Sequence, residues 1–188
     1  MSLSGEEAKT HLSEAETAGR RSSQLYHYHK ASPHLMMWGG IWVLGYGGTA
    51  LSPPYSDLIW TILVLAGVAG GAWIGRCSST WGWGEAGRNP KSWRMVSLAA
   101  IAVFFVMATY AIMQPTHGPQ FAAYPALITG TVYAAIGLWI GIRYVVTGIL
   151  VVALTLFGFY HLQEYILWWL AFVGGGSMIL AGLWFRTV

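Results

Sequence analysis

The stretch that decides the fold covers residues 124–185, YPALITGTVYAAIGLWIGIRYVVTGILVVALTLFGFYHLQEYILWWLAFVGGGSMILAGLWF. Its charged residues are Arg143 and Glu164, which divide it into three uncharged segments. A bilayer core of about 30 Å is crossed by roughly 20 apolar residues in a helix, so each segment is long enough for one span. The apolar residues are continuous and do not alternate as in barrel strands, which favours helices.

The rest of the chain has the same character. Charged residues make up 9% and apolar residues 55% of the 188 residues, whereas about a quarter of a soluble domain is charged. We therefore predict an all-α polytopic membrane protein with six transmembrane helices in a compact bundle. The predicted spans are approximately residues 35–51, 58–75, 95–113, 121–142, 144–160 and 165–185.

The first 33 residues are polar, so they are predicted to form an N-terminal tail ahead of a membrane domain at 34–188. Residues 5–31 contain no proline and place acids early and bases late, an order that suits the helix dipole. We expect one helix, or two, in this segment, ending where Ser32-Pro33 interrupts the helix. No apolar segment of the signal-peptide type stands at the amino terminus, so we expect this chain to be the mature protein.

The basic residues predict the orientation, because Lys and Arg near span ends are retained on the cytoplasmic side. With six spans, all ten basic residues fall on one face: Lys9, Arg20, Arg21, Lys30, Arg76, Arg88, Lys91, Arg94, Arg143 and Arg186. The opposite face receives Asp57, His117, His161 and Glu164. Both termini are therefore predicted to be cytoplasmic. Topology accounts for the net charge of +3, and no nucleic-acid partner is expected.

No Asp, Glu, Lys, Arg or His lies in the middle of a predicted span, which argues against proton pumps, ion-coupled transporters, voltage sensors and transmembrane haem. His161 and Glu164 are three residues apart, and with His117 they are candidates for a metal site on the outer rim. Solvated loop polarity is the interpretation that we favour for these three residues. No metal, cofactor or catalytic residue is predicted, and this rim site is the only enzymatic alternative.

Small residues predict where helices pack closely. Gly67, Gly71 and Gly75 recur at four-residue spacing in the second span, and Gly137 and Gly141 repeat the pattern in the fourth. We expect these glycines to pack within the monomer, with a homodimer or a subunit interface as the alternative.

The sequence YHYHK at the end of the tail, which comprises Tyr26, His27, Tyr28, His29 and Lys30, is predicted to be an interfacial anchor whose rings lie at headgroup level. Partner binding and metal chelation by the histidines are the alternatives.

Aromatic and glycine texture recurs in RRSSQLYHYHKASPHLMMWGGIWVLGYG (20–47), YPALITGTVYAAIGLWIGIRY (124–144) and WWLAFVGGGSMILAGLWFR (168–186). In this texture, nearly the whole chain resembles a group of small bacterial inner-membrane proteins of unassigned function. The resemblance implies a bacterial inner membrane and carries no activity onto particular residues.

Two functions are compatible with the sequence. The first is an accessory or regulatory subunit or scaffold, which binds a membrane-protein complex or a second copy through its helices and a cytoplasmic partner through residues 1–33. The second is a small transporter or channel for a neutral or weakly polar solute, built from two three-helix units of opposite orientation. Membrane lipids are expected partners in both cases, and bound lipid is compatible with either.

Overall fold

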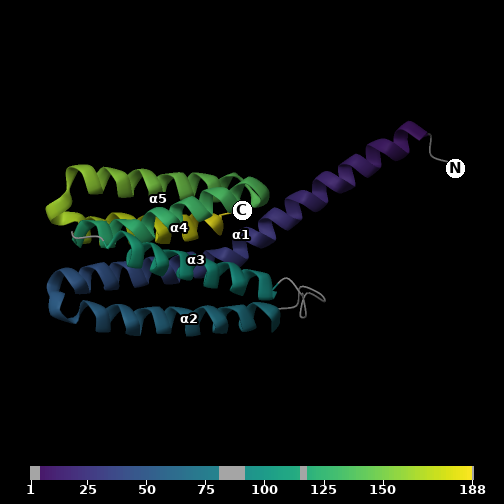
Figure 1. Cartoon of the computed structure of the whole chain (residues 1–188). Helices are drawn as coiled ribbons and strands as arrows, with labels where there is room; N and C mark the ends of the chain where they lie inside the picture. Colours follow the sequence, from purple (N-terminus) through teal and green to yellow (C-terminus); the bar gives the residue numbers. More distant parts are fainter. Residues whose placement is uncertain (1–4, 81–91, 115–117, 188) are drawn as a thin grey trace.

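A computed structural model describes residues 5–80, 92–114 and 118–187 of the chain. These residues form helices joined by turns and contain no strand, which confirms the predicted all-α class. The elements are α1 (Gly5–Leu51), the 3-10 helix η1 (Pro53–Tyr55), α2 (Ser56–Thr80), α3 (Ser92–Met113), α4 (Gly118–Ile140), α5 (Ile142–His161), the 3-10 helix η2 (Gln163–Tyr165), α6 (Ile166–Trp169), the π-helical η3 (Leu170–Gly175) and α7 (Gly176–Phe185). Figure 1 shows that consecutive long helices run in opposite directions.

Four segments of the described chain are long and apolar enough to cross a membrane: Pro53–Gly75, Gly118–Ile140, Ile142–His161 and Gln163–Phe185. They coincide with four of the predicted spans and indicate residence in a membrane. The other two predicted spans, 35–51 and 95–113, are helical but are not among these four. The count of six therefore stays a prediction.

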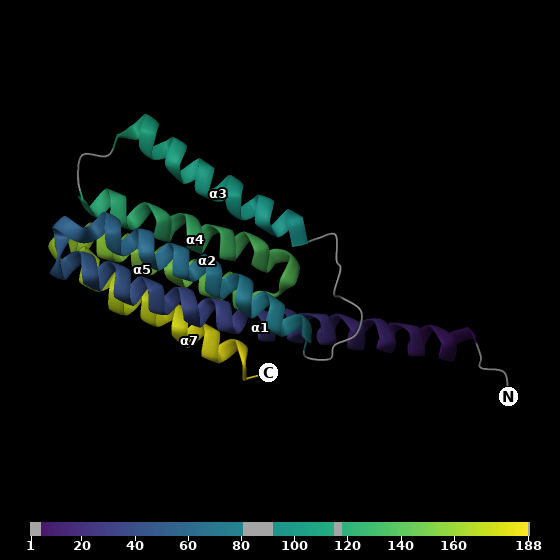
Figure 2. The same cartoon turned by 90° about the horizontal axis from the view of Figure 1, so that it is seen from below.

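The predicted helix break at Ser32-Pro33 is wrong, because α1 continues through Pro33 without interruption. Proline removes one backbone hydrogen bond from a helix, and neighbouring helices in a membrane protein offset this loss by holding the chain on both sides. Here Ser32 and Leu35 are fully buried. The Ser32 hydroxyl donates a hydrogen bond of 2.6 Å to the carbonyl of Gly182 in α7. The N-terminal part of α1 then projects away from the bundle (Figures 1 and 2).

The centre of the bundle is formed by α1, α4, α5 and the continuous rod from η2 to α7. The most extensive contacts join α4 to α5, and α1 to η3 and α7. In contrast, α2 packs mainly along α1, and α3 lies apart from the other helices (Figure 2). Tyr110 connects α3 to α4, since its hydroxyl donates to the carbonyl of Phe121 at 2.7 Å.

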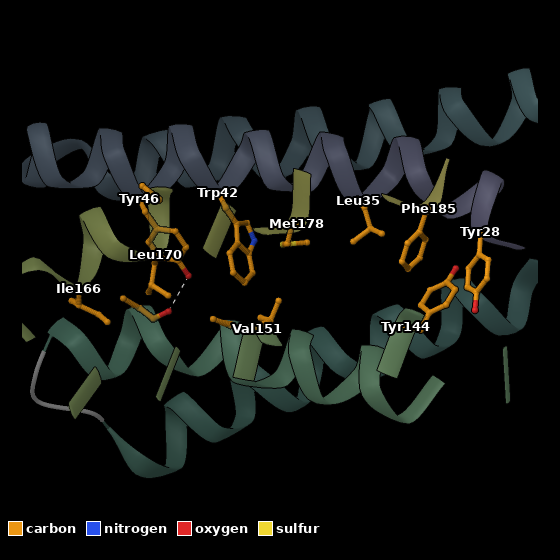
Figure 3. Close-up of a cluster of buried hydrophobic side chains, with 13 residues drawn as sticks. Tyr28, Leu35, Trp42, Tyr46, Tyr144, Val151, Ile166, Leu170, Met178 and Phe185 are labelled. Carbon is orange, nitrogen blue, oxygen red and sulfur yellow. Dashed lines mark hydrogen bonds between the residues drawn. The ribbon is translucent and has the colours of Figure 1, made fainter. Parts of the chain in front are cut away.

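The buried side chains form one continuous core along the axis of the bundle (Figure 3). At one end Tyr28, Tyr144 and Phe185 point toward one another. Toward the other end Trp42 packs edge-on against Tyr46, whose hydroxyl donates to the carbonyl of Ala122 at 2.9 Å. The core therefore ties α1 to both α4–α5 and the C-terminal rod.

The turns gather at two opposite ends of the bundle. One end holds the projecting part of α1, the α4–α5 turn and the carboxyl end of α7, and the other holds η1 and η2 (Figures 1 and 2). Arg143 and Arg186 accordingly lie at the first end, and Asp57 and Glu164 lie at the second. This arrangement follows the predicted division of charge, while the side of the membrane that each end faces stays a prediction.

Candidate functional site

The structure places two of the three candidate metal ligands at the η1–η2 end. His161 is the last residue of α5 and Glu164 lies in η2, and both are exposed. The His161 ring packs against the Phe157 ring with 4.9 Å between centroids. His117 lies outside the described residues. Within the described ranges, no three His, Cys, Asp or Glu side chains are grouped so that they could hold a metal ion.

The predicted anchor segment divides into exposed and buried residues. His27, His29 and Lys30 are exposed, and the Lys30 ammonium lies 5.7 Å from the centre of the Tyr26 ring. Desolvation and the nearby Lys30 charge lower the pKa of His27. These positions are compatible with an anchor at the membrane surface.

Tyr28 does not fit that description, because only 5% of its surface is exposed. Its ring stacks on Tyr144 with 5.8 Å between centroids and packs against Phe185 at 5.1 Å. The anchor interpretation of Tyr28 is therefore corrected: it is a core residue that joins α1 to α5 and α7. A helix places Tyr28 about 100° away from each of its neighbours, so one residue of the segment can face inward while the others face outward.

The predicted packing glycines of α2 differ in their surroundings. A Cβ atom built on Gly67 would lie 2.7 Å from Cδ1 of Ile41, so α2 approaches α1 closely at this residue. At Gly71 the same atom would be 3.6 Å from the His34 ring, which is ordinary contact. At Gly75 it would meet no described atom within 4 Å. The close approach is thus centred on Gly67.

In α4, Gly137 lies directly against the backbone of Val145 in α5. Gly141 belongs to the turn after α4, since the helix ends at Ile140. Its φ of 154° is rarely adopted by L side chains, and a Cβ atom there would collide with the Tyr28 hydroxyl. Gly141 therefore packs closely against Tyr28 of α1, but it does so from a turn and not from the face of a helix.

Other close helix contacts were not predicted from the sequence. Gly39 and Gly175 bring α1 against η3, and Gly130 and Gly148 bring α4 against α5. Each pair consists of single glycines on two different helices, so no GxxxG spacing marks it. The usable signal was the presence of glycine itself in an apolar helix, where it costs helix propensity.

A cluster of polar groups lies where α1, α5 and α7 meet. Arg143 Nη1 donates to the carbonyl of Trp184, and its guanidinium carbon lies 4.7 Å from the centre of the Trp184 ring. The same Nη1 lies 3.4 Å from Oγ1 of Thr187. The backbone N–H of Arg143 points to the Tyr28 hydroxyl at 3.4 Å.

Arg186 makes a second connection at this end. Its Nε donates to Oγ of Ser32 at 3.0 Å, while the Ser32 hydroxyl donates to Gly182. Throughout the described ranges, neither Arg143 nor Arg186 has a carboxylate within ion-pair distance. From the sequence, both arginines predict only the orientation of the chain. Arg143 stands alone between two long uncharged runs, and this isolation was the available signal.

Comparison of the chain with protein-family models, with curated proteins and with solved structures finds no match. The resemblance to small bacterial inner-membrane proteins therefore stays a prediction.

Proposed function

We propose that this chain is an accessory or regulatory subunit in the bacterial inner membrane, with both termini in the cytoplasm and the projecting part of α1 as its contact to a cytoplasmic partner. One observation supports this proposal above the others. A single helix, α1, begins outside the bundle and then runs through its core.

The outer part of α1 presents side chains that its own bundle does not cover. Leu12 and Leu25 are 64% and 38% exposed, and the described side chains from residue 11 to 25 are exposed throughout. Most helical stability in proteins comes from packing against another surface. A partner that packs against the face of α1 that carries Leu12 would supply that surface.

The inner part of α1 is fixed in the bundle by Leu35, Trp42 and Tyr46, which are 0%, 6% and 4% exposed. Since no break separates the two parts, a partner that binds the tail acts on a helix that contacts α2, η3 and α7. Because α1 is continuous, a displacement of its tail by a partner would also displace the part of α1 that lies in the bundle.

The packing of the bundle supports this role over the alternative of a solute conduit. A conduit needs polar groups along a continuous path. The buried polar side chains of the described residues are Ser32, Thr147 and Thr155, and each donates to a backbone carbonyl. The core of the bundle is filled by aromatic and aliphatic side chains (Figure 3).

Site-specific photo-crosslinking in cells tests the proposal. A crosslinking residue replaces Leu12 on the tail, and the matched control replaces Tyr55, which has nearly the same exposure, 63%, but lies in η1 at the opposite end. We expect a discrete crosslinked protein from position 12 that is absent from position 55. A particle of monomer mass in mild detergent, together with no crosslink from position 12, would refute the accessory role.

Accessibility of engineered cysteines tests the topology separately. A cysteine at Arg88 is expected to be protected from a membrane-impermeant thiol reagent in intact cells, and a cysteine at His117 is expected to react. Labelling of both from the same side would refute six spans with cytoplasmic termini.

A further inference from the structure

A shallow apolar groove runs along the outside of the bundle between α5 and α7. It is lined by Val146, Thr147, Leu150, Ser177, Leu180 and Trp184 and has a volume of about 220 Å³. The hydroxyls of Thr147 and Ser177 donate to carbonyls of their own helices, those of Arg143 and Gly174. The groove therefore presents an apolar surface to whatever occupies it.

This groove reaches a cation at the end of the bundle. Trp184 lines the groove, and the guanidinium of Arg143 lies over its ring. Nη1 of Arg143 is occupied by Trp184 and Thr187, whereas Nε and Nη2 have no hydrogen bond to any described residue. An arginine fork with two nitrogens available is suited to a phosphate, which it binds in a bidentate manner.

We propose that this groove and Arg143 form a binding site for one anionic phospholipid, with an acyl chain along the α5–α7 groove and the phosphate diester on Arg143 beside the Thr187 hydroxyl. The helices that form the groove, α5 and the rod that includes α7, are two of the four segments able to cross a membrane. Lipid is thus the medium that the groove faces. Arg143 follows the turn at one end of these spans, where headgroups lie.

The charge of the site favours an anionic lipid over a zwitterionic one. The structure places no described carboxylate within ion-pair distance of Arg143, so no acidic side chain among the described residues balances its charge. Arg186 adds a second positive charge at the same end of the bundle, but it bonds to Ser32 of α1 on another side of α7. Arg186 therefore contributes to the local potential without contacting the groove.

Native mass spectrometry of the full-length protein in mild detergent, titrated with phosphatidylglycerol, tests the site. We expect one tightly bound lipid on the wild type and a loss of affinity of about tenfold or more in Arg143→Gln, the size expected for one charge-assisted hydrogen bond. Arg186→Gln is the matched control, since it removes the same charge from the same end, and it is expected to keep most of the affinity.

A groove variant separates the lipid from a simple anion. Val146 is 44% exposed, so Val146→Phe fills the groove from outside without disturbing the core. It is expected to lose phosphatidylglycerol and to keep the fold, which circular dichroism checks. If Arg143→Gln fails to fold, the affinities of Val146→Phe and Arg143→Lys for phosphatidylglycerol test the proposal in its place.

Three results would overturn the proposal. Equal retention of phosphatidylglycerol by the wild type, Arg143→Gln and Val146→Phe would mean non-specific surrounding lipid only. Inorganic phosphate that displaces phosphatidylglycerol at similar concentration would mean an anion site without a lipid groove. Phosphatidylcholine that binds as tightly as phosphatidylglycerol would remove the role of the uncompensated charge.

Discussion

The contact between α1 and the C-terminal rod can be tested with two neighbouring glycines. A Cβ atom on Gly39 would lie 2.7 Å from both the carbonyl oxygen of Gly175 and Cγ1 of Ile179, whereas ordinary contact begins at 3.4 Å. The helices would have to separate by about 0.7 Å, the difference between these two distances. A Cβ atom on Gly40 would meet no atom within 4 Å.

Gly39→Ala and Gly40→Ala share every effect except this collision. Both gain up to about 1 kcal/mol of helix propensity on replacing glycine. Only Gly39→Ala adds the cost of overpacking, about 1–3 kcal/mol, because one colliding atom belongs to the backbone and cannot rotate away. We expect Gly40→Ala to be as stable as the wild type or more so, and Gly39→Ala to be less stable than Gly40→Ala by that overpacking cost.

The assay is unfolding of the purified protein by sodium dodecyl sulfate in mixed micelles, followed by circular dichroism. Gly175→Ala and Gly176→Ala repeat the test from the other helix: Gly175 faces the Gly39 carbonyl at 2.7 Å, and Gly176 faces open space. The double variant Gly39→Ala/Gly175→Ala should lose less free energy of unfolding than the two single variants lose together, because the first methyl group already separates the helices. Equal stability of Gly39→Ala and Gly40→Ala would refute the close approach of α1 to η3.

Three further predictions use the same unfolding assay. Tyr28→Phe should lower the free energy of unfolding by no more than about 1 kcal/mol, because it loses only the long contact to the Arg143 backbone. Tyr28→Ala should lower it by about 3–5 kcal/mol through loss of the buried ring. Equal losses would contradict the burial of Tyr28. Ser32→Ala should cost about 1–3 kcal/mol because it leaves a buried carbonyl unpaired, and exposed Ser22→Ala, the control, should be within about 0.5 kcal/mol of the wild type. Desolvation lowers the pKa of His27 below its ordinary 6.5, so the unfolded state binds a proton at His27 more readily than the folded state does. The stability of the fold should therefore decrease as the pH falls below about 6.5. His27→Gln should reduce that decrease.

Helix type and helix ends were largely predictable because they depend on local sequence. Long uncharged runs set the apolar length, and charges or prolines set the ends. The first span was predicted to end at Leu51 and the third at Met113, and both helices end there. The fifth span was placed one residue short of the observed end of α5 at His161.

Features that depend on contacts between distant residues were not predictable in this way. Pro33 was expected to end a helix, but the buried bond from Ser32 to Gly182, 150 residues away, holds α1 together at this point. The inward orientation of Tyr28 likewise depends on Tyr144 and Phe185. Arg143 was interpreted as a mark of topology because nothing local shows that Trp184 would lie beside it.

These contacts also determine which part of the bundle would respond to a partner on the tail. A shift of α1 along its axis would break the hydrogen bond from Ser32 to Gly182 and move Gly39 out of register with Gly175. Both contacts lie on the rod that contains η3 and α7, which is also one wall of the proposed lipid groove. A π-helical segment such as η3 often marks a functional position within a helix. The rod is therefore the element through which binding at the tail and lipid binding at Arg143 would be coupled.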